Sequence, residues 1–100
     1  IYVKADYSLI KIVLDDIQYI EALADYIKIY LPNRKFITAR MTMKTIMEKL
    51  PVSRFVRVHR SFILPVDRII SVRNRTISIE GREIPVGTSY EEELNKIVYK

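Results

Sequence analysis

Hydrophobic and polar residues alternate with a period of two along most of the chain. This alternation predicts half-buried β-strands, because successive side chains of a strand point to opposite faces of its sheet. The β-branched and aromatic residues that fill these segments support the same interpretation. The strands expected in the first forty residues are 2–6, 9–14, 17–23, 26–31 and 35–40, of which the last two form a hairpin across Pro32-Asn33-Arg34.

The period changes after Thr42, which is a suitable N-cap for a helix. Apolar residues then recur at positions i, i+3, i+4 and i+7, which predicts a short helix with one buried stripe. Pro51 ends this helix. Methionine at helical spacing usually fills a core, so we expect the whole stripe to be buried. Its members are Met43, Ile46, Met47 and Leu50.

Strand patterns return in the second half of the chain, and they are disturbed at His59-Arg60-Ser61. Ser89 and Glu92 have the spacing of a capping box, which predicts a C-terminal helix. We therefore expect a single all-β domain over residues 1–100, mostly antiparallel, with about ten short strands in small sheets and two short helices. The remaining predicted strands are 54–58, 62–64, 69–73, 76–80 and 83–86.

Composition narrows the classes of function. The chain has no cysteine, which excludes a disulfide framework and a thiolate metal site. This absence fits a reducing cytosol but is otherwise neutral on the compartment; we expect a cytoplasmic protein. No apolar run approaches the length of a membrane span, so we expect no membrane partner. The first residue is Ile1 rather than methionine, which suggests a fragment of a longer chain.

Positive charge is concentrated in the middle of the sequence. Residues 34–75 hold eleven lysines and arginines against two acidic residues, a net charge of +9, whereas the segments on either side are each at −2. Such a block attracts polyanions, of which nucleic acid is the commonest, although a solvated basic face that binds nothing is the alternative. If about six of these cations contact phosphates, log affinity falls with log salt at a slope of about −5.

Catalytic chemistry has little support. The chain has one histidine, His59, and no Gly-rich phosphate loop or two-histidine metal spacing, so we expect no enzyme, no metal and no cofactor. Asp15 and Asp16 are adjacent aspartates at a strand end, where they usually form turns.

One motif resembles a known family. Residues 55–64, F-V-R-V-H-R-S-F-I-L, are similar to the central signature of LytTR DNA-binding domains, F-x-R-V-H-R-S-(Y/F)-(I/L/V). Residues 16–22, D-I-Q-Y-I-E-A, resemble the family's first signature, and residues 25–29 resemble its next strand. Residues 41–44 with 50–51 resemble the helix before the central motif, and residues 84–90 the closing strand and turn. The resemblance covers residues 9–98 in unbroken order.

The resemblance implies a fold, a function and partners. LytTR domains are elongated sets of small β-sheets that usually follow a phosphorylatable receiver domain. They bind direct repeats in double-stranded DNA through loops that enter successive major grooves, and thereby regulate transcription. We therefore expect double-stranded DNA and a receiver domain of the full-length protein as partners, with a possible dimer on DNA.

The family contacts bases from three loops. Here these loops carry the base-contact candidates Tyr26, Arg60, Ser61, Thr88 and Ser89. The sequence departs from the family pattern at two places: many relatives have arginine where Gly87-Thr88-Ser89 stands, and the first loop contains an acidic residue, Asp25.

The residues themselves also favour Arg60. It interrupts an apolar face, so the strand should end or bulge there, and an arginine on a rigid loop suits bidentate recognition of guanine. The alternative is an Arg60 paired with a local carboxylate. For His59 we favour a hydrogen-bonded role in the scaffold. Candidates for phosphate contacts, which position a protein without specifying sequence, are Lys28, Arg40, Lys44, Arg54 and Arg57.

Two other functions remain open. A protein-interaction module that has lost DNA recognition is compatible with the missing arginine of the third loop. A single-stranded nucleic-acid binder is compatible with exposed tyrosines as stacking platforms. Those tyrosines are Tyr19, Tyr26 and Tyr30.

Overall fold

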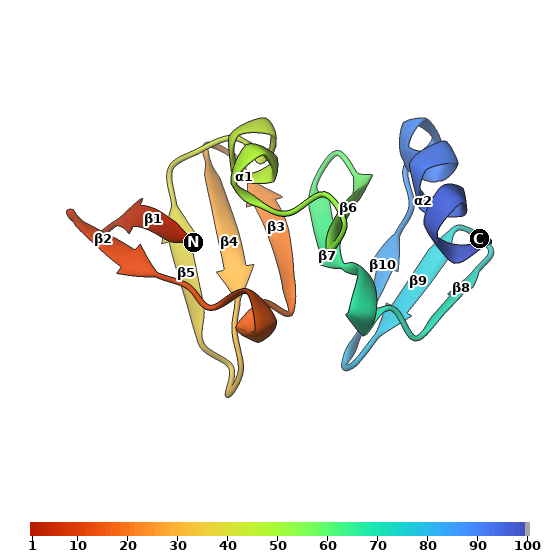
Figure 1. Cartoon of the computed structure of the whole chain (residues 1–100), viewed down its shortest axis with the longest axis horizontal. Helices are drawn as coiled ribbons and strands as arrows, with labels where there is room; N and C mark the ends of the chain where they lie inside the picture. The colour runs from red at the N-terminus through yellow and green to blue at the C-terminus, as the bar shows by residue number, and fades with distance from the viewer. Residues whose placement is uncertain (100) are drawn as a thin grey trace.

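The structure is a computed structural model that describes residues 1–99, and it contains three antiparallel sheets (Figure 1). The first sheet is the hairpin of β1 (Tyr2–Ala5) and β2 (Ser8–Lys11). The second sheet has the order β5-β4-β3-β7-β6, and the third has the order β10-β9-β8. The second sheet consists of β3 (Tyr19–Leu23), β4 (Tyr26–Tyr30), β5 (Phe36–Ala39), β6 (Phe55–His59) and β7 (Phe62–Pro65). The third consists of β8 (Ser71–Arg73), β9 (Thr76–Ile79) and β10 (Arg82–Pro85).

Within residues 1–99, two short α-helices accompany the sheets. They are α1 (Met43–Lys49), between β5 and β6, and α2 (Glu91–Val98), at the C-terminal end. Three single 3₁₀ turns, η1 (Leu14–Asp16), η2 (Val66–Arg68) and η3 (Thr88–Tyr90), complete the elements. The molecule measures 40 × 26 × 23 Å, with the three sheets following one another along its long axis (Figure 1). The predicted fold class, mostly antiparallel strands in small sheets with two short helices, is confirmed.

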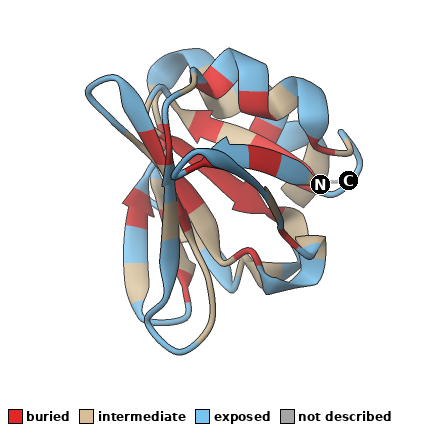
Figure 2. Ribbon diagram, turned by 90° about the vertical axis from the view of Figure 1, so that its left-hand side faces the viewer, coloured by how far each residue is buried: buried red, intermediate tan, exposed pale blue. Residues whose placement is uncertain are grey.

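The five-stranded sheet separates two hydrophobic cores. One core lies on the face that α1 and the β1–β2 hairpin cover, and it includes Ile20, Ile29 and Ile46. The other core lies where the opposite face of β6 and β7 packs against the third sheet and α2, and it includes Val58 and Leu94. Buried and exposed positions alternate along the strands (Figure 2), as the period of two predicts.

Helix α1 forms as its sequence predicts. The Thr42 hydroxyl accepts a hydrogen bond of 3.1 Å from the amide of Thr45, which satisfies one of the free donors of the first turn. The helix ends before Leu50 and Pro51. Met43, Ile46 and Leu50 are buried and Met47 is partly buried, so the apolar stripe is confirmed.

Three expectations need correction. The strand expected over residues 9–14 ends at Lys11, and the strand expected from Ile17 begins at Tyr19, because η1 turns the chain between them. The capping box is wrong: Ser89 lies inside η3, so Tyr90 is the N-cap of α2, and its side chain makes no capping hydrogen bond. The end or bulge expected where Arg60 interrupts the strand pattern is confirmed: residues 60–61 are the tight turn of the β6–β7 hairpin, with a bulge between Arg57 and His59. No helix within residues 1–99 has the length and hydropathy of a membrane span.

Candidate nucleic-acid interface

Three loops meet at one edge of the molecule, at the top of Figure 1. The β3–β4 turn and the β6–β7 turn are adjacent because β3 pairs with β7, and the amide of Ala22 donates a hydrogen bond of 2.9 Å to the carbonyl of Ser61. The segment after β10 joins them through a hydrogen bond of 2.8 Å from the amide of Gly87 to the carbonyl of Val58. We call residues 24–26, 60–61 and 87–90 the loop edge. The pairing of β3 with β7 and the hydrogen bond from Gly87 to Val58 therefore bring together the three loops named from the sequence.

Tyr26 begins β4 at the first of these loops, and 41% of its surface is exposed. The guanidinium of Arg40 lies over the Tyr26 ring, with its carbon 5.2 Å from the ring centroid, and donates a hydrogen bond of 3.1 Å to the phenol oxygen. This hydrogen bond is the main reason that the pKa of Arg40 is raised above its ordinary value. Arg40 therefore presents a permanent positive charge beside the first loop.

A hollow of about 440 Å³ lies between the first loop and the N-terminal end of α1. Its wall carries three basic side chains, those of Arg40, Lys44 and Arg57, and one acidic residue, Asp25. Lys44 is exposed on the first turn of α1. The hollow gives the loop edge a cationic flank next to Tyr26.

The second loop is the two-residue turn Arg60-Ser61. Arg60 is exposed, and no ion pair or hydrogen bond joins its guanidinium to another residue within 1–99. The alternative of a local carboxylate partner is therefore not observed in the described chain. His59 acts in the scaffold as predicted: its Nδ1 accepts a hydrogen bond of 3.1 Å from the Ser61 amide, and its ring packs against Phe62.

The third loop carries Thr88 and Ser89, both exposed in η3. Gly87 precedes them and lies against the second loop. A methyl group placed on Gly87 would lie 3.0 Å from Cδ2 of Tyr90 and 3.6 Å from Cα of His59, so a glycine here allows the close approach.

Arg57 makes contacts that the sequence did not reveal. Its Nη2 donates a hydrogen bond of 2.7 Å to the carbonyl of Arg60, and its Nε donates one of 3.3 Å to the carbonyl of His59. The guanidinium carbon also lies 5.3 Å from the centroid of the Tyr90 ring. Arg57 thus contacts both the second and the third loop. The spacing of Arg57 and Arg60 across a bulge is a signal that could have pointed to this arrangement.

The sequence of the chain is similar to those of a known family. Residues 7–98 match the family of LytTr DNA-binding domains. The chain belongs to the LytTR family. It is 29% identical over 97 residues, 91% of this chain and 39% of the relative, to the sensory transduction protein LytT of Bacillus anthracis. It is also 37% identical over 68 residues, 62% of this chain and 28% of the relative, to LytT of Bacillus subtilis strain 168.

The fold also has a counterpart of known structure. A LytTr DNA-binding domain from Bacillus cereus superposes with a TM-score of 0.80 over 98% of this chain and 94% of that chain, at 24% identity. The curated relatives are longer: this LytTR domain spans about 39% of the first of them.

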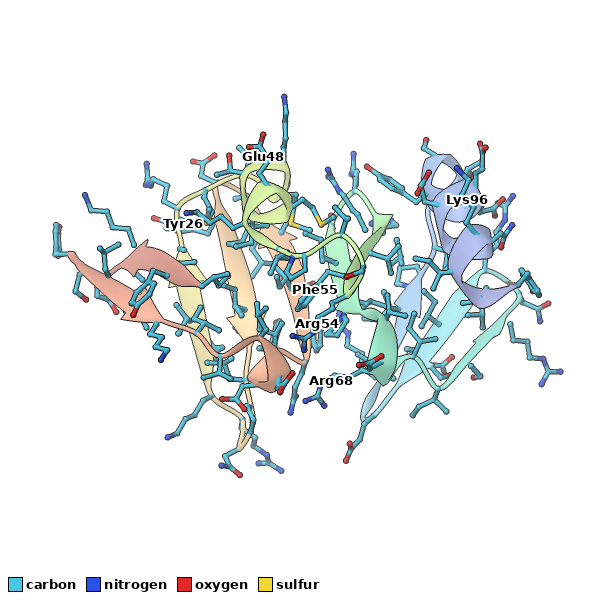
Figure 3. All side chains as sticks on the ribbon, viewed as in Figure 1. Tyr26, Glu48, Arg54, Phe55, Arg68 and Lys96 are labelled. Carbon is cyan, nitrogen blue, oxygen red and sulfur yellow. The ribbon has the colours of Figure 1, made fainter. Side chains whose placement is uncertain are left out.

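Not every basic residue named from the sequence lies at the loop edge. Lys28 lies in the middle of β4, where its ammonium is 3.9 Å from the centroid of the Phe36 ring. Arg54 precedes β6 at the opposite end of that strand and pairs with Asp15. Figure 3 shows Arg54 and Arg68 well below Tyr26. The basic segment of the sequence is therefore divided between the loop edge and the opposite edge of the LytTR domain.

The tyrosine platform is also incomplete. Tyr19 and Tyr30 are partly buried rather than exposed, and they stack on each other with centroids 4.1 Å apart. Burial and a hydrogen bond of 2.9 Å to Glu21 raise the pKa of the Tyr30 phenol well above its ordinary value. Only Tyr26 of the three is exposed, so the expectation of three exposed stacking tyrosines is wrong.

Proposed function

We propose that this LytTR domain binds double-stranded DNA sequence-specifically and regulates transcription as the effector domain of a response regulator. The observation that carries the proposal is the loop edge: three neighbouring loops present exposed polar and cationic side chains side by side. Membership of a family of DNA-binding domains supports it. A rigid scaffold with exposed loops is the usual arrangement for specific recognition.

Base contacts come from the tips of the three loops. Arg60 has an exposed guanidinium whose five donors suit the O6 and N7 acceptors of guanine in a major groove. The other candidates offer hydroxyl groups or a phenol, which form hydrogen bonds with several bases. They are Tyr26, Ser61, Thr88 and Ser89.

Phosphate contacts come from Arg40 and Lys44, which flank the first loop and line the same hollow. Contacts of this kind fix the protein on the duplex and make its affinity salt-dependent. Lys28 and Arg54 lie away from the loop edge, so we exclude them from the proposed interface.

The length of the curated relatives bears on the partners that we propose for this domain. Their greater length, with the chain spanning about 39% of the first, leaves room for a receiver domain in the full-length protein. Binding to direct repeats would place two copies on one duplex and favour a dimer there. A regulator of this kind acts in the cytoplasm.

Selection of bound duplexes from a random pool tests the proposal. The selected duplex is then competed against its own separated strands and against a scrambled duplex. We expect enrichment of one sequence, and we expect the separated strands and the scrambled duplex to displace it far less well than the unlabelled selected duplex does. Equal displacement by single strands would support the single-strand alternative, and failure to bind any duplex would support a protein-interaction module.

A further inference from the structure

We infer that Arg57 is a positioning residue that holds the second and third loops as one unit, so that Arg60 and η3 meet the DNA in a fixed relation. The effect on DNA recognition rests on the proposed function. The contacts of Arg57 with both loops, which we call the brace, are a property of the free protein. It assigns Arg57 a role different from the phosphate contact that its charge alone suggests.

The first part of the brace is on the second loop. Arg57 donates to the carbonyls of both His59 and Arg60, at 3.3 and 2.7 Å. These carbonyls lie at the bulge and turn of the β6–β7 hairpin, where strand pairing does not satisfy every backbone group. Charge-assisted hydrogen bonds are about twice as strong as neutral ones, so Arg57 fixes the backbone from which the Arg60 side chain projects.

The second part of the brace reaches the third loop. The guanidinium that binds the turn carbonyls also lies over the Tyr90 ring, with its carbon 5.3 Å from the ring centroid. The Tyr90 amide donates a hydrogen bond of 2.9 Å to the carbonyl of Gly87, and the Gly87 amide donates to Val58. One side chain therefore contacts both loops directly, and these backbone hydrogen bonds join the third loop to β6 as well.

The same contacts argue against a phosphate role for Arg57. Two of its donors point to backbone carbonyls, one ring face covers it, and it is only partly exposed. Lysine cannot replace it, because an ammonium is a point charge and lacks the planar fork that serves two carbonyls and stacks on a ring. A phosphate contact, by contrast, tolerates lysine well.

The brace is tested first without DNA, by NMR hydrogen exchange and amide shifts of the whole chain. In Arg57→Lys we expect faster exchange of the Ser61 amide together with shifts at Gly87 and Tyr90. In Tyr90→Leu we expect shifts at Arg60 and Ser61, across the gap between the loops, whereas Tyr90→Phe keeps the ring and should leave the second loop unchanged. The inference would be overturned if Arg57→Lys shifted amides of the second loop only and Tyr90→Leu shifted amides of the third loop only.

The effect of Arg57 on DNA recognition is tested by measuring the affinity of each variant for the selected and scrambled duplexes over a salt series. We expect Arg57→Lys and Arg57→Gln to lower the ratio of specific to non-specific affinity about tenfold or more, since charged hydrogen bonds of this strength are lost, with an unchanged salt slope. Arg73→Gln, an exposed arginine at the end of β8, is the control and should have no effect. Wild-type behaviour of Arg57→Lys, or equal losses on both duplexes with a salt slope lower by about one unit, would overturn the inference.

Different results would contradict the proposed function and the positioning role of Arg57. If the wild-type chain shows no preference for any duplex, the proposed function fails, and the NMR measurements still decide whether Arg57 couples the two loops. Thermal unfolding of each variant identifies a general loss of structure. In that case Tyr90→Phe against Tyr90→Leu provides the comparison that decides.

Discussion

Arg82 and Tyr19 are joined by a hydrogen bond of 2.7 Å from the guanidinium Nη1 to the phenol oxygen, across 63 positions of sequence. The Arg82 guanidinium also lies over the rings of Tyr19 and Phe62, at 5.1 Å from each centroid. Partial burial lowers the pKa of Arg82, but the hydrogen bonds to Tyr19 and Glu21 outweigh it and the pKa is raised. This contact ties β10 of the third sheet to β3 of the second, which holds the sheets that carry the three loops in one arrangement.

Tyr30 belongs to the same network, and its ionisation predicts how stability depends on pH. Its pKa is raised in the folded state, so the unfolded chain releases the phenol proton first as pH rises past about 10. The contribution of this group to stability is complete below that pH and is lost as pH rises further. We expect the urea midpoint of the wild type to fall more between pH 9 and 11 than that of Tyr30→Phe, and parallel curves would contradict this.

Ile46 tests the packing of α1. Its side chain is 0% exposed in the core beneath the five-stranded sheet. Ile46→Ala should lower the free energy of unfolding by about 2–5 kcal/mol, because it removes buried methyl groups and leaves a cavity. Glu48→Ala, on the exposed side of the same helix, is the control and should change it by less than about 0.5 kcal/mol. Equal effects of the two substitutions would mean that the helix phase is wrong.

Sequence patterns predicted a helix, cap or turn correctly where neighbouring residues alone determine it. The stripe from Met43 to Leu50 follows directly from helical spacing, and Thr42 caps the helix as expected. The expected strands 69–73 and 76–80 leave Asn74-Arg75 between them as a turn, and both of these residues have positive φ, which asparagine tolerates better than most residues. The capping box failed because η3 carries the chain one residue further before α2 begins, which the S-x-x-E spacing does not reveal.

Relationships between distant segments could not be predicted in this way. Arg54 and Arg60 are six positions apart in one basic segment, yet they lie at opposite ends of β6, because charge along a sequence does not indicate direction in a sheet. The adjacency of the first two loops depends on the pairing of β3 with β7. The family resemblance named these loops, but it did not reveal that Arg57 contacts two of them.

The division of the basic segment changes the expected salt dependence. Arg40 and Lys44, which flank the loop edge, are the two proposed phosphate contacts, so log affinity for duplex DNA should fall with log salt at a slope of about −2, shallower than the sequence alone suggested. Arg40→Ala and Lys44→Ala should each lower the magnitude of this slope by about one unit on every duplex. Arg34→Ala, at the opposite end of the molecule in the β4–β5 turn, should leave it unchanged. An effect of Arg34 equal to that of Arg40 would place the DNA elsewhere.

The affinity of Arg60→Ala for the selected and the scrambled duplex tests the central claim most directly. If Arg60 contacts a base from the turn that β6 and β7 form, the substitution should cost about 1–3 kcal/mol on the selected duplex and relax the preference at one base position. Binding to the scrambled duplex should weaken little, and the salt slope should stay the same. Equal losses on both duplexes would show that Arg60 contacts phosphate, and would contradict recognition of sequence from this turn.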